Sequence, residues 1–323
     1  MTAFLPEPGP PREDLPVELE WFGVSTFRLR VGDTVVFLDA YLDRVPAAPP
    51  VGLASREVTA ADAVLVGHSH FDHLHGAQFI AARTGARIVG SHETVRLMSE
   101  AGIPDDQLVA AAGGELIQLG PAVRARVLPS LHSCVWARGT PAGQPPERGL
   151  SQQERERRLA ASRAGRLDRV PDEVREHLRA CVSSPRGDGG ALGYLLDTPA
   201  GSVYWADTSG YWTGIVTGLR PDIAVLAAAG TGNVDGEPVA GRLADFVADQ
   251  VSLLQPRHLV LCHHDDWMPP VTAPTDLAEI RAALARRAPA VQLHEPGYGS
   301  ALRLDRILAS SPATPGGPAQ TSG

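Results

Sequence analysis

The chain has 323 residues, of which 43% are hydrophobic and 20% charged, and its formal net charge is −8. This length suffices for one large α/β domain or two smaller ones, and the composition excludes a small disulfide-stabilised protein, a collagen-like fibre and an acidic disordered chain. The cysteines Cys134, Cys181 and Cys262 form no even set and indicate a reducing compartment. Because the sequence lacks a signal-peptide pattern and any apolar run near the roughly 18 residues of a membrane span, we expect a soluble cytoplasmic protein.

Short strands alternate with amphipathic helices along the first half of the chain. Segments 17–23, 26–31 and 34–40 have strand character and are separated by glycine-containing turns, which predicts a three-stranded meander. Further along we expect a strand at 61–67, a helix at 76–84, a strand at 86–90, a helix at 92–100 and a pair of strands within 114–130.

The second half repeats this pattern. We expect strands at 191–198, 201–207, 222–230 and 258–264, helices at 243–254 and 277–287, and a strand at 290–297 that closes the fold. Two β-rich halves, each with helices after its strands, predict an α/β fold with four layers, an αβ/βα sandwich in which two packed sheets carry helices on the outside.

The expected domain spans residues 17–309. Two segments flank it and a third is inserted within it. The Pro-rich leader 1–16 and the tail 310–323 are expected to be disordered. Segment 138–190 holds eleven Arg and eight acidic residues, with candidate helices at 152–163 and 172–181. This composition is typical of a solvated insertion, and a lid or a dimer contact is the alternative because long inserts in compact domains often have a function.

The strongest chemical signal is the run HSHFDH at 68–73, which follows the apolar strand at 61–67. This run holds three histidines and one aspartate, all of which can bind metal. Placing these four polar side chains together in one turn would cost free energy unless a positive charge lay among them. His68 and His70 are two apart on an extended segment, so they project to the same side and can hold one ion. Asp72 and His73 can reach a second ion beside it. The pattern predicts a site for zinc, manganese or iron.

The run HSHFDH resembles the HxHxDH signature of the metallo-β-lactamase superfamily. Further ligands of that superfamily have counterparts in chain order, each at the end of an expected strand: His132 in LPSLHS, Asp207 in VYWADTSG and His263 in LVLCHHDDW. The resemblance covers roughly residues 18–306. It is closest to the branch that contains L-ascorbate-6-phosphate lactonase and the N-acylphosphatidylethanolamine phospholipase D group, although the insertion departs from the small members of that branch.

The resemblance implies a metal-dependent hydrolase of the metallo-β-lactamase fold with two divalent ions, for which zinc is favoured over manganese or iron. The first ion would be bound by His68, His70 and His132, the second by Asp72, His73 and His263, with Asp207 bridging them. A water shared by two such ions has a pKa of about 7 and supplies a hydroxide that cleaves an ester, lactone or phosphodiester bond. Asp72 and Asp207 are therefore the candidate catalytic residues, and Asp72 or a metal-bound water would protonate the leaving group.

Residues next to the ligands receive supporting roles. By resemblance, Asp39 at a strand end supports the ligand loop without binding metal, and His75 is expected to do the same. His263 is preferred over its neighbour His264 as the last ligand, and His264 is assigned to the layer around the ligands.

Aromatic residues follow three of the ligand motifs closely. Trp136 lies four residues after His132, Tyr211 and Trp212 lie just after Asp207, and Trp267 lies four residues after His263. These four rings form a candidate pocket for an apolar or ring-bearing small molecule. Packing of the rings beneath their loops is the alternative.

Other functions fit the sequence less well. A mononuclear iron oxidoreductase of the persulfide dioxygenase type uses fewer protein ligands than the set found here, whereas a phospholipase D-like lipid phosphodiesterase stays open as a hydrolase alternative. The net charge disfavours nucleic acid as a partner. We expect a small-molecule substrate and no membrane span, and a homo-oligomer is left open.

Overall fold

The computed structural model describes residues 15–137, 146–167, 170–185 and 187–310. Nearly all of the expected leader and tail, and parts of the insertion, therefore lie outside the described residues. Within the described part of the chain, no helix is both long and apolar enough to cross a membrane.

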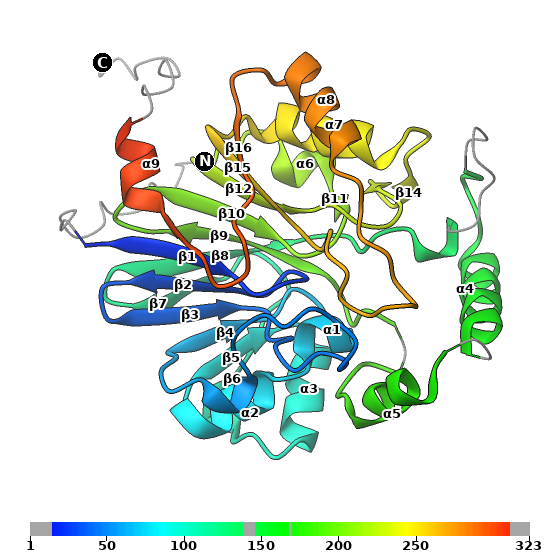
Figure 1. Cartoon of the computed structure of the whole chain (residues 1–323), viewed down its shortest axis with the longest axis horizontal. Coiled ribbons are helices and arrows are strands. Elements are labelled where there is room, and N and C mark those ends of the chain that lie inside the picture. Colours follow the sequence, from blue (N-terminus) through cyan, green and yellow to red (C-terminus); the bar gives the residue numbers. More distant parts are fainter. Residues whose placement is uncertain (1–14, 138–145, 168–169, 186, 311–323) are drawn as a thin grey trace, which may run out of the picture.

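The first sheet has seven strands in the order β17-β1-β2-β3-β4-β5-β6 (Figure 1). Strands β1 to β3 form the expected antiparallel meander, and β3 to β6 run parallel. In β2, Phe27, Leu29 and Val31 are buried while the arginines between them are less so, which is the alternation of a sheet with one face in the core. The strands are β1 (Val17–Trp21), β2 (Phe27–Val31), β3 (Thr34–Leu38), β4 (Ala63–Leu65), β5 (Arg87–Gly90), β6 (Leu108–Ala110) and β17 (Ala301–Arg303).

The second sheet also has seven strands, in the order β16-β15-β12-β10-β9-β8-β7. Strands β10, β12, β15 and β16 run parallel, and β7 to β10 are antiparallel. Its strands are β7 (Leu116–Gly120), β8 (Val123–Pro129), β9 (Leu192–Asp197), β10 (Ser202–Ala206), β12 (Ile223–Ala227), β15 (His258–Cys262) and β16 (Gln292–His294). A small third sheet contains β11 (Gly210–Tyr211), β13 (Asn233–Val234) and β14 (Glu237–Pro238), none of which we predicted.

Helices cover the outer faces of both sheets, so the predicted four-layer αβ/βα sandwich is confirmed (Figure 1). One apolar cluster lies between the sheets and includes Trp205 and Tyr194; a second packs α7 and α8 on the second sheet, and a third packs α2 and α3 on the first. The helices are α1 (Phe71–Leu74), α2 (Ala77–Thr84), α3 (His92–Glu100), α4 (Gln152–Leu167), α5 (Asp172–Ala180), α6 (Thr213–Val216), α7 (Leu243–Leu254), α8 (Ala278–Arg287) and α9 (Leu304–Ser310), with 3₁₀ turns at Ser55–Glu57, Asp105–Gln107 and Val135–Ala137.

The C-terminal end of the fold differs from our expectation. The strand near 290–297 does not close the structure, because β17 follows it, crosses to the first sheet and pairs antiparallel with β1. Helix α9 then contributes Leu304 and Leu308 to the cluster between the sheets. This return was missed because β17 has only three residues, too few for a period-2 pattern to be recognised.

Candidate metal centre

Loops that follow five strands of the two sheets meet at one end of the sandwich. Asp39 follows β3, His68 follows β4, His132 follows β8, Asp207 follows β10 and His263 follows β15. The carboxyl ends of strands that run in one direction lie at the same edge of a sheet, and this edge is the usual site of function in α/β folds. The packing of the two sheets therefore brings these five residues together.

The turn after β4 lies very close to Asp207. A Cβ atom at Gly67 would lie 2.1 Å from the Asp207 carboxylate, so only glycine allows this approach. His70 then precedes the one-turn helix α1, and its carbonyl accepts the backbone N–H of Leu74 at 2.9 Å. This short helix carries Asp72 and His73 into the same region.

Three groups of side chains at this edge have the geometry of metal ligands, and neighbouring groups share members. Within each group the ligand atoms lie within 4.8 Å of one another. The groups are His68, His70 and His132; His68, His73 and Asp207; and Asp72, His73 and His263. All seven residues that the sequence suggested as ligands therefore converge.

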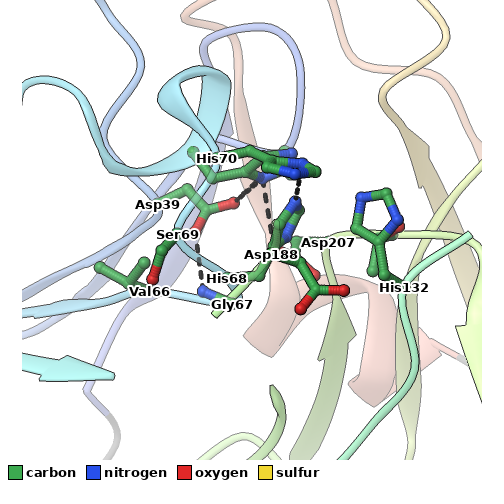
Figure 2. Close-up of polar contacts among 12 residues, drawn as sticks. Asp39, Val66, Gly67, His68, Ser69, His70, His132, Asp188 and Asp207 are labelled. Carbon is green, nitrogen blue, oxygen red and sulfur yellow. Dashed lines mark hydrogen bonds and ion pairs between the residues drawn. The ribbon is translucent and has the colours of Figure 1, made fainter. Parts of the chain in front are cut away.

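The contacts inside the groups are close, and Figure 2 shows the surroundings of His68, His70 and Asp207. His68 Nε2 and His70 Nδ1 lie 3.0 Å apart. One oxygen of Asp207 lies 2.6 Å from His68 Nδ1 and 3.2 Å from His73 Nδ1. A carboxylate oxygen of Asp72 lies 3.6 Å from His73 Nε2 and 3.4 Å from His263 Nε2. Asp207 thus lies between the histidines of the first and the third group.

The donor set fits divalent metal ions. Asp207 Oδ1 and His263 Nδ1 are buried and have no hydrogen-bond partner among the described residues. Buried polar atoms are costly when unpaired, and a cation among the groups would satisfy the carboxylate oxygen. Imidazole and carboxylate ligands suit zinc, manganese and iron.

The pKa values of the ligands follow from their burial. Burial lowers the pKa values of His68 and His70 well below the usual value, which keeps both rings neutral, the form that binds metal. Burial raises the pKa of Asp207 to about 6, against the opposing effect of His73 and His132. For Asp72 burial acts in the same direction, but the neighbouring His73 and His263 outweigh it, and the net pKa lies below its usual value.

Asp39 supports the ligand turn through three contacts. Its Oδ1 accepts the backbone N–H of Gly67 at 2.9 Å, and its Oδ2 accepts the Ser25 hydroxyl at 2.6 Å. The same Oδ2 lies 2.6 Å from His73 Nδ1. Asp39 is not a member of any of the three groups. These contacts fix the orientation of the His73 ring, which is the usual role of a carboxylate behind a ligating histidine.

His264 and His75 lie outside the three groups of ligand atoms. The His264 ring stacks on Trp21 with a centroid distance of 4.8 Å. His75 Nδ1 lies 3.4 Å from the Gln78 side chain and 3.4 Å from the backbone N–H of Val182. His75 therefore contacts the insertion rather than the candidate ligands.

The four aromatic residues of the candidate pocket have different positions. The Trp267 ring meets His263 at a centroid distance of 5.6 Å and so borders the third group. The Trp136 ring lies under the Arg155 guanidinium at 4.7 Å, and Trp212 is 38% exposed. Tyr211 does not line the site, because its buried ring stacks on Phe246 in the core beneath α7, and its assignment to the pocket was wrong.

Phe71, which we did not predict, borders the site instead. This half-buried residue lies between His70 and Asp72, and its ring is 5.9 Å from that of Trp267. Its position inside the HSHFDH run was the only signal in the sequence.

The insertion packs against the candidate centre. Tyr41 Oη and His177 Nε2 of α5 lie 2.8 Å apart, and Val174 of α5 belongs to an apolar cluster with Val45 and Met268. Figure 1 shows α4 and α5 on the side of the sandwich where α1 follows β4. The interpretation of this segment as a solvated insertion is therefore wrong for α5, which has an apolar face that is buried against the loops of the site. The described side chains of α4 are exposed or half-buried, as expected.

Comparisons with known proteins agree with this architecture. The model of a family described as "Beta-lactamase superfamily domain" matches residues 34–181, which include the run HSHFDH and His132, whereas Asp207 and His263 lie beyond the match. A UPF0173 metal-dependent hydrolase of Pyrobaculum calidifontis is 34% identical over 39% of this chain and 55% of its own length. One from Myxococcus xanthus is 36% identical over 37% of this chain and 40% of its own length. The chain thus spans about half the length of the curated relatives it matches.

Solved structures resemble the fold over most of the chain. Igni18, described as a novel metallo hydrolase from Ignicoccus hospitalis, has 18% sequence identity and a TM-score of 0.57, and covers 89% of this chain and 97% of its own. An isothiocyanate hydrolase from Delia radicum gut bacteria has 14% identity and a TM-score of 0.55, over 88% of this chain and 98% of its own. At these identities the likeness concerns the fold.

Proposed function

We propose that the chain is a member of the metallo-β-lactamase superfamily, whose domain model matches residues 34–181, and that it is a hydrolase whose activity depends on two metal ions. One observation carries the proposal: the three groups of ligand atoms share His68 and His73, so two ions bound in the outer groups would be neighbours. The names of the curated relatives, metal-dependent hydrolases, support the same function.

In the proposed centre His68, His70 and His132 would hold the first ion, and Asp72, His73 and His263 would hold the second. Asp207, which contacts both His68 and His73, would contribute its carboxylate between the two sets of ligands. When bound, such a pair of ions, with zinc favoured over manganese or iron, supplies a hydroxide nucleophile at neutral pH and neutralises the charge that develops on the substrate.

The protein residues hold and orient this centre. Asp39 fixes the His73 ring and the Gly67 backbone, so the ligand turn is organised before substrate arrives. The lowered pKa of Asp72 favours its role as an anionic ligand, so we do not assign the leaving-group proton to it.

We propose that the substrate is a small ester, lactone or phosphodiester with an apolar group. Phe71 and Trp267 are half-buried rings on the Asp72 and His263 side of the centre. Partly exposed aromatic rings beside a polar centre favour apolar or ring-bearing groups of a ligand. The sequence resemblance to the lactonase and phospholipase D branch supports the same bond types.

A substrate panel with two neighbouring variants tests the proposal. We expect the wild-type protein to hydrolyse at least one of a set of lactones, aryl esters, phosphodiesters and phospholipids, to lose that activity with a chelator and to recover it with zinc. His263→Ala should lower kcat/KM by about 100-fold or more because a ligand is lost. His264→Ala, which removes a ring stacked on Trp21 next to it, is the matched control and should retain most of the activity.

Activity that survives the chelator would contradict a metal-dependent mechanism. Equal losses in the His263→Ala and His264→Ala variants would contradict the assignment of the last ligand.

A further inference from the structure

The insertion returns to the second sheet along the candidate ligand turn. We define the return segment as Ser184 together with residues 187–192. Leu192 N–H donates to the Gly67 carbonyl at 2.8 Å, and the Ser69 N–H donates to the Asp188 carbonyl at 2.7 Å. Ser184 N–H in turn donates to the Ser69 carbonyl at 2.9 Å. The return segment thus binds the main chain on both sides of His68.

Ser69 lies between two proposed ligands of the first ion, His68 and His70. Both of its main-chain polar groups are bound by the return segment, and its buried hydroxyl lies 2.9 Å from Thr94 Oγ1 at the start of α3. Residues 71–74 are fixed in a different way, by the hydrogen bonds of α1. The positions of His68 and His70 therefore depend on the return segment. The positions of Asp72 and His73 depend on it less, because α1 holds them.

Gly189 allows the return segment to approach Ser69 and Glu93 closely. Its φ is +75°, and a Cβ atom there would lie 2.7 Å from Ser69 Oγ and 2.8 Å from Glu93 Cβ. Ser69 Oγ could rotate away, but Glu93 Cβ is fixed on α3, so the segment itself would have to move. Gly190 is its natural comparison, because its φ is +94° and a Cβ atom there would meet nothing within 4 Å.

Other residues of the insertion, which precede residues 187–192 in the chain, also contact the rest of the domain. Helix α5 of the insertion is held by the contact between His177 and Tyr41 and by the apolar cluster around Val174. Ser184 Oγ then donates to Glu93 Oε1 at 3.0 Å. The return segment therefore contacts the main chain around His68 and His70, two of the three proposed ligands of the first ion.

We propose that the return segment is a positioning element that holds the His68–Ser69–His70 turn in its metal-binding geometry. The insertion then sets the affinity of the first metal site instead of acting as a detachable lid. This inference rests on the proposed metal-binding function, but the hold on Ser69 is a property of the metal-free chain and can be measured separately.

The test compares Gly189→Ala with Gly190→Ala in the full-length protein. Both substitutions place alanine at a positive φ, whereas only the first drives a methyl group into Ser69 and Glu93. We expect Gly189→Ala to speed amide hydrogen exchange at Ser69 in the metal-free protein. This exchange is measured by mass spectrometry of the peptides that contain Ser69. Competition with a chromophoric chelator should show that the substitution lowers the affinity of the protein for one of its two zinc ions by about 10- to 100-fold. Gly190→Ala should resemble the wild type in both measurements.

The inference is overturned if folded Gly189→Ala exchanges and binds zinc like the wild type, or if Gly190→Ala is impaired as strongly. Should Gly189→Ala not fold, Ser184→Pro is subjected to the same two measurements, because it removes the N–H that donates to the Ser69 carbonyl along with the hydroxyl that donates to Glu93. Ser184→Ala, which removes the hydroxyl and keeps the N–H, is its control. If the wild type binds no zinc, the proposed function fails, while the exchange at Ser69 still decides whether the return segment holds the turn.

Discussion

Burial affects the two carboxylates of the candidate centre differently because their neighbours differ. Asp72 lies between the rings of His73 and His263, which outweigh burial and lower its pKa, so it stays anionic. For Asp207 burial dominates, and its pKa rises to about 6. A divalent ion beside Asp207 would reverse this effect, since a bound cation is the largest local charge in such a site. Below about pH 6, the charge of Asp207 therefore depends on whether metal is bound.

A histidine far from the centre gives a prediction for stability against pH. His258 is fully buried in β15, where its Nδ1 lies 2.9 Å from His294 Nε2. Burial, together with His294 and Arg257, lowers its pKa from 6.5 to about 4. The unfolded chain therefore binds more protons than the folded one between these values, and stability is lost as pH falls from 6.5 to about 4.

Urea unfolding at several pH values measures this effect. We expect His258 to contribute a slope of at most about 1.4 kcal/mol per pH unit in that window. His258→Gln should flatten the slope, whereas His92→Gln, at an exposed position on α3, should leave it unchanged. An identical slope in the wild type and His258→Gln would show that another group dominates acid unfolding.

The loop after β15 is held in place by the turn between β1 and β2. Val24 has a φ of +48°, which is unfavourable for a β-branched residue, and His263 has a φ of +59°, in the same left-handed region. The His263 N–H donates to the Val24 carbonyl at 2.6 Å, and the Val24 N–H donates to Asp265 Oδ1 at 3.0 Å. Asp265 Oδ2 is bound by Arg44 and by Tyr298. This network compensates for the strain and fixes the direction of the His263 ring.

Removing the charge of Asp265 should destabilise the protein strongly. In Asp265→Asn the Arg44 guanidinium, whose side chain is 4% exposed, stays buried without an anionic partner. We expect a loss of about 3 kcal/mol in the free energy of unfolding, measured by urea denaturation. Asp62→Asn is the control, because the Asp62 carboxylate also accepts a main-chain N–H but is exposed. A similar decrease in the free energy of unfolding in both variants would mean that the buried ion pair stabilises the protein no more than the exposed carboxylate does.

The elements differ in how far the sequence predicted them. Period-2 and helical patterns predicted β1, β2, β3, α3 and α7, and the resemblance of the HSHFDH run indicated the loops that converge with it. Sequence spacing could not predict which way a ring faces in a two-residue strand, so Tyr211 was misassigned. Contacts such as Arg44 with Asp265, 221 residues apart, arise only from tertiary packing. The docking of the insertion on Ser69 was missed for the same reason, since its hydrogen bonds use main-chain groups.

On the scale of the whole molecule, the candidate centre joins the two halves of the sandwich. The ligand turn and α1 follow a strand of the first sheet, whereas His132, Asp207 and His263 follow strands of the second. Bound metal would therefore connect loops of both sheets, and its affinity would add to the stability of the folded chain.

Metal content per chain, measured by mass spectrometry on protein purified without chelators, tests the central claim most directly. We predict about two equivalents of zinc, manganese or iron per chain in the wild type. The Asp207→Ala variant should retain fewer, because the carboxylate between the two groups is lost, and Asp62→Asn should equal the wild type. One iron per chain would instead favour the mononuclear oxidoreductase. A folded protein that holds no metal and takes up none when zinc is added would contradict the account.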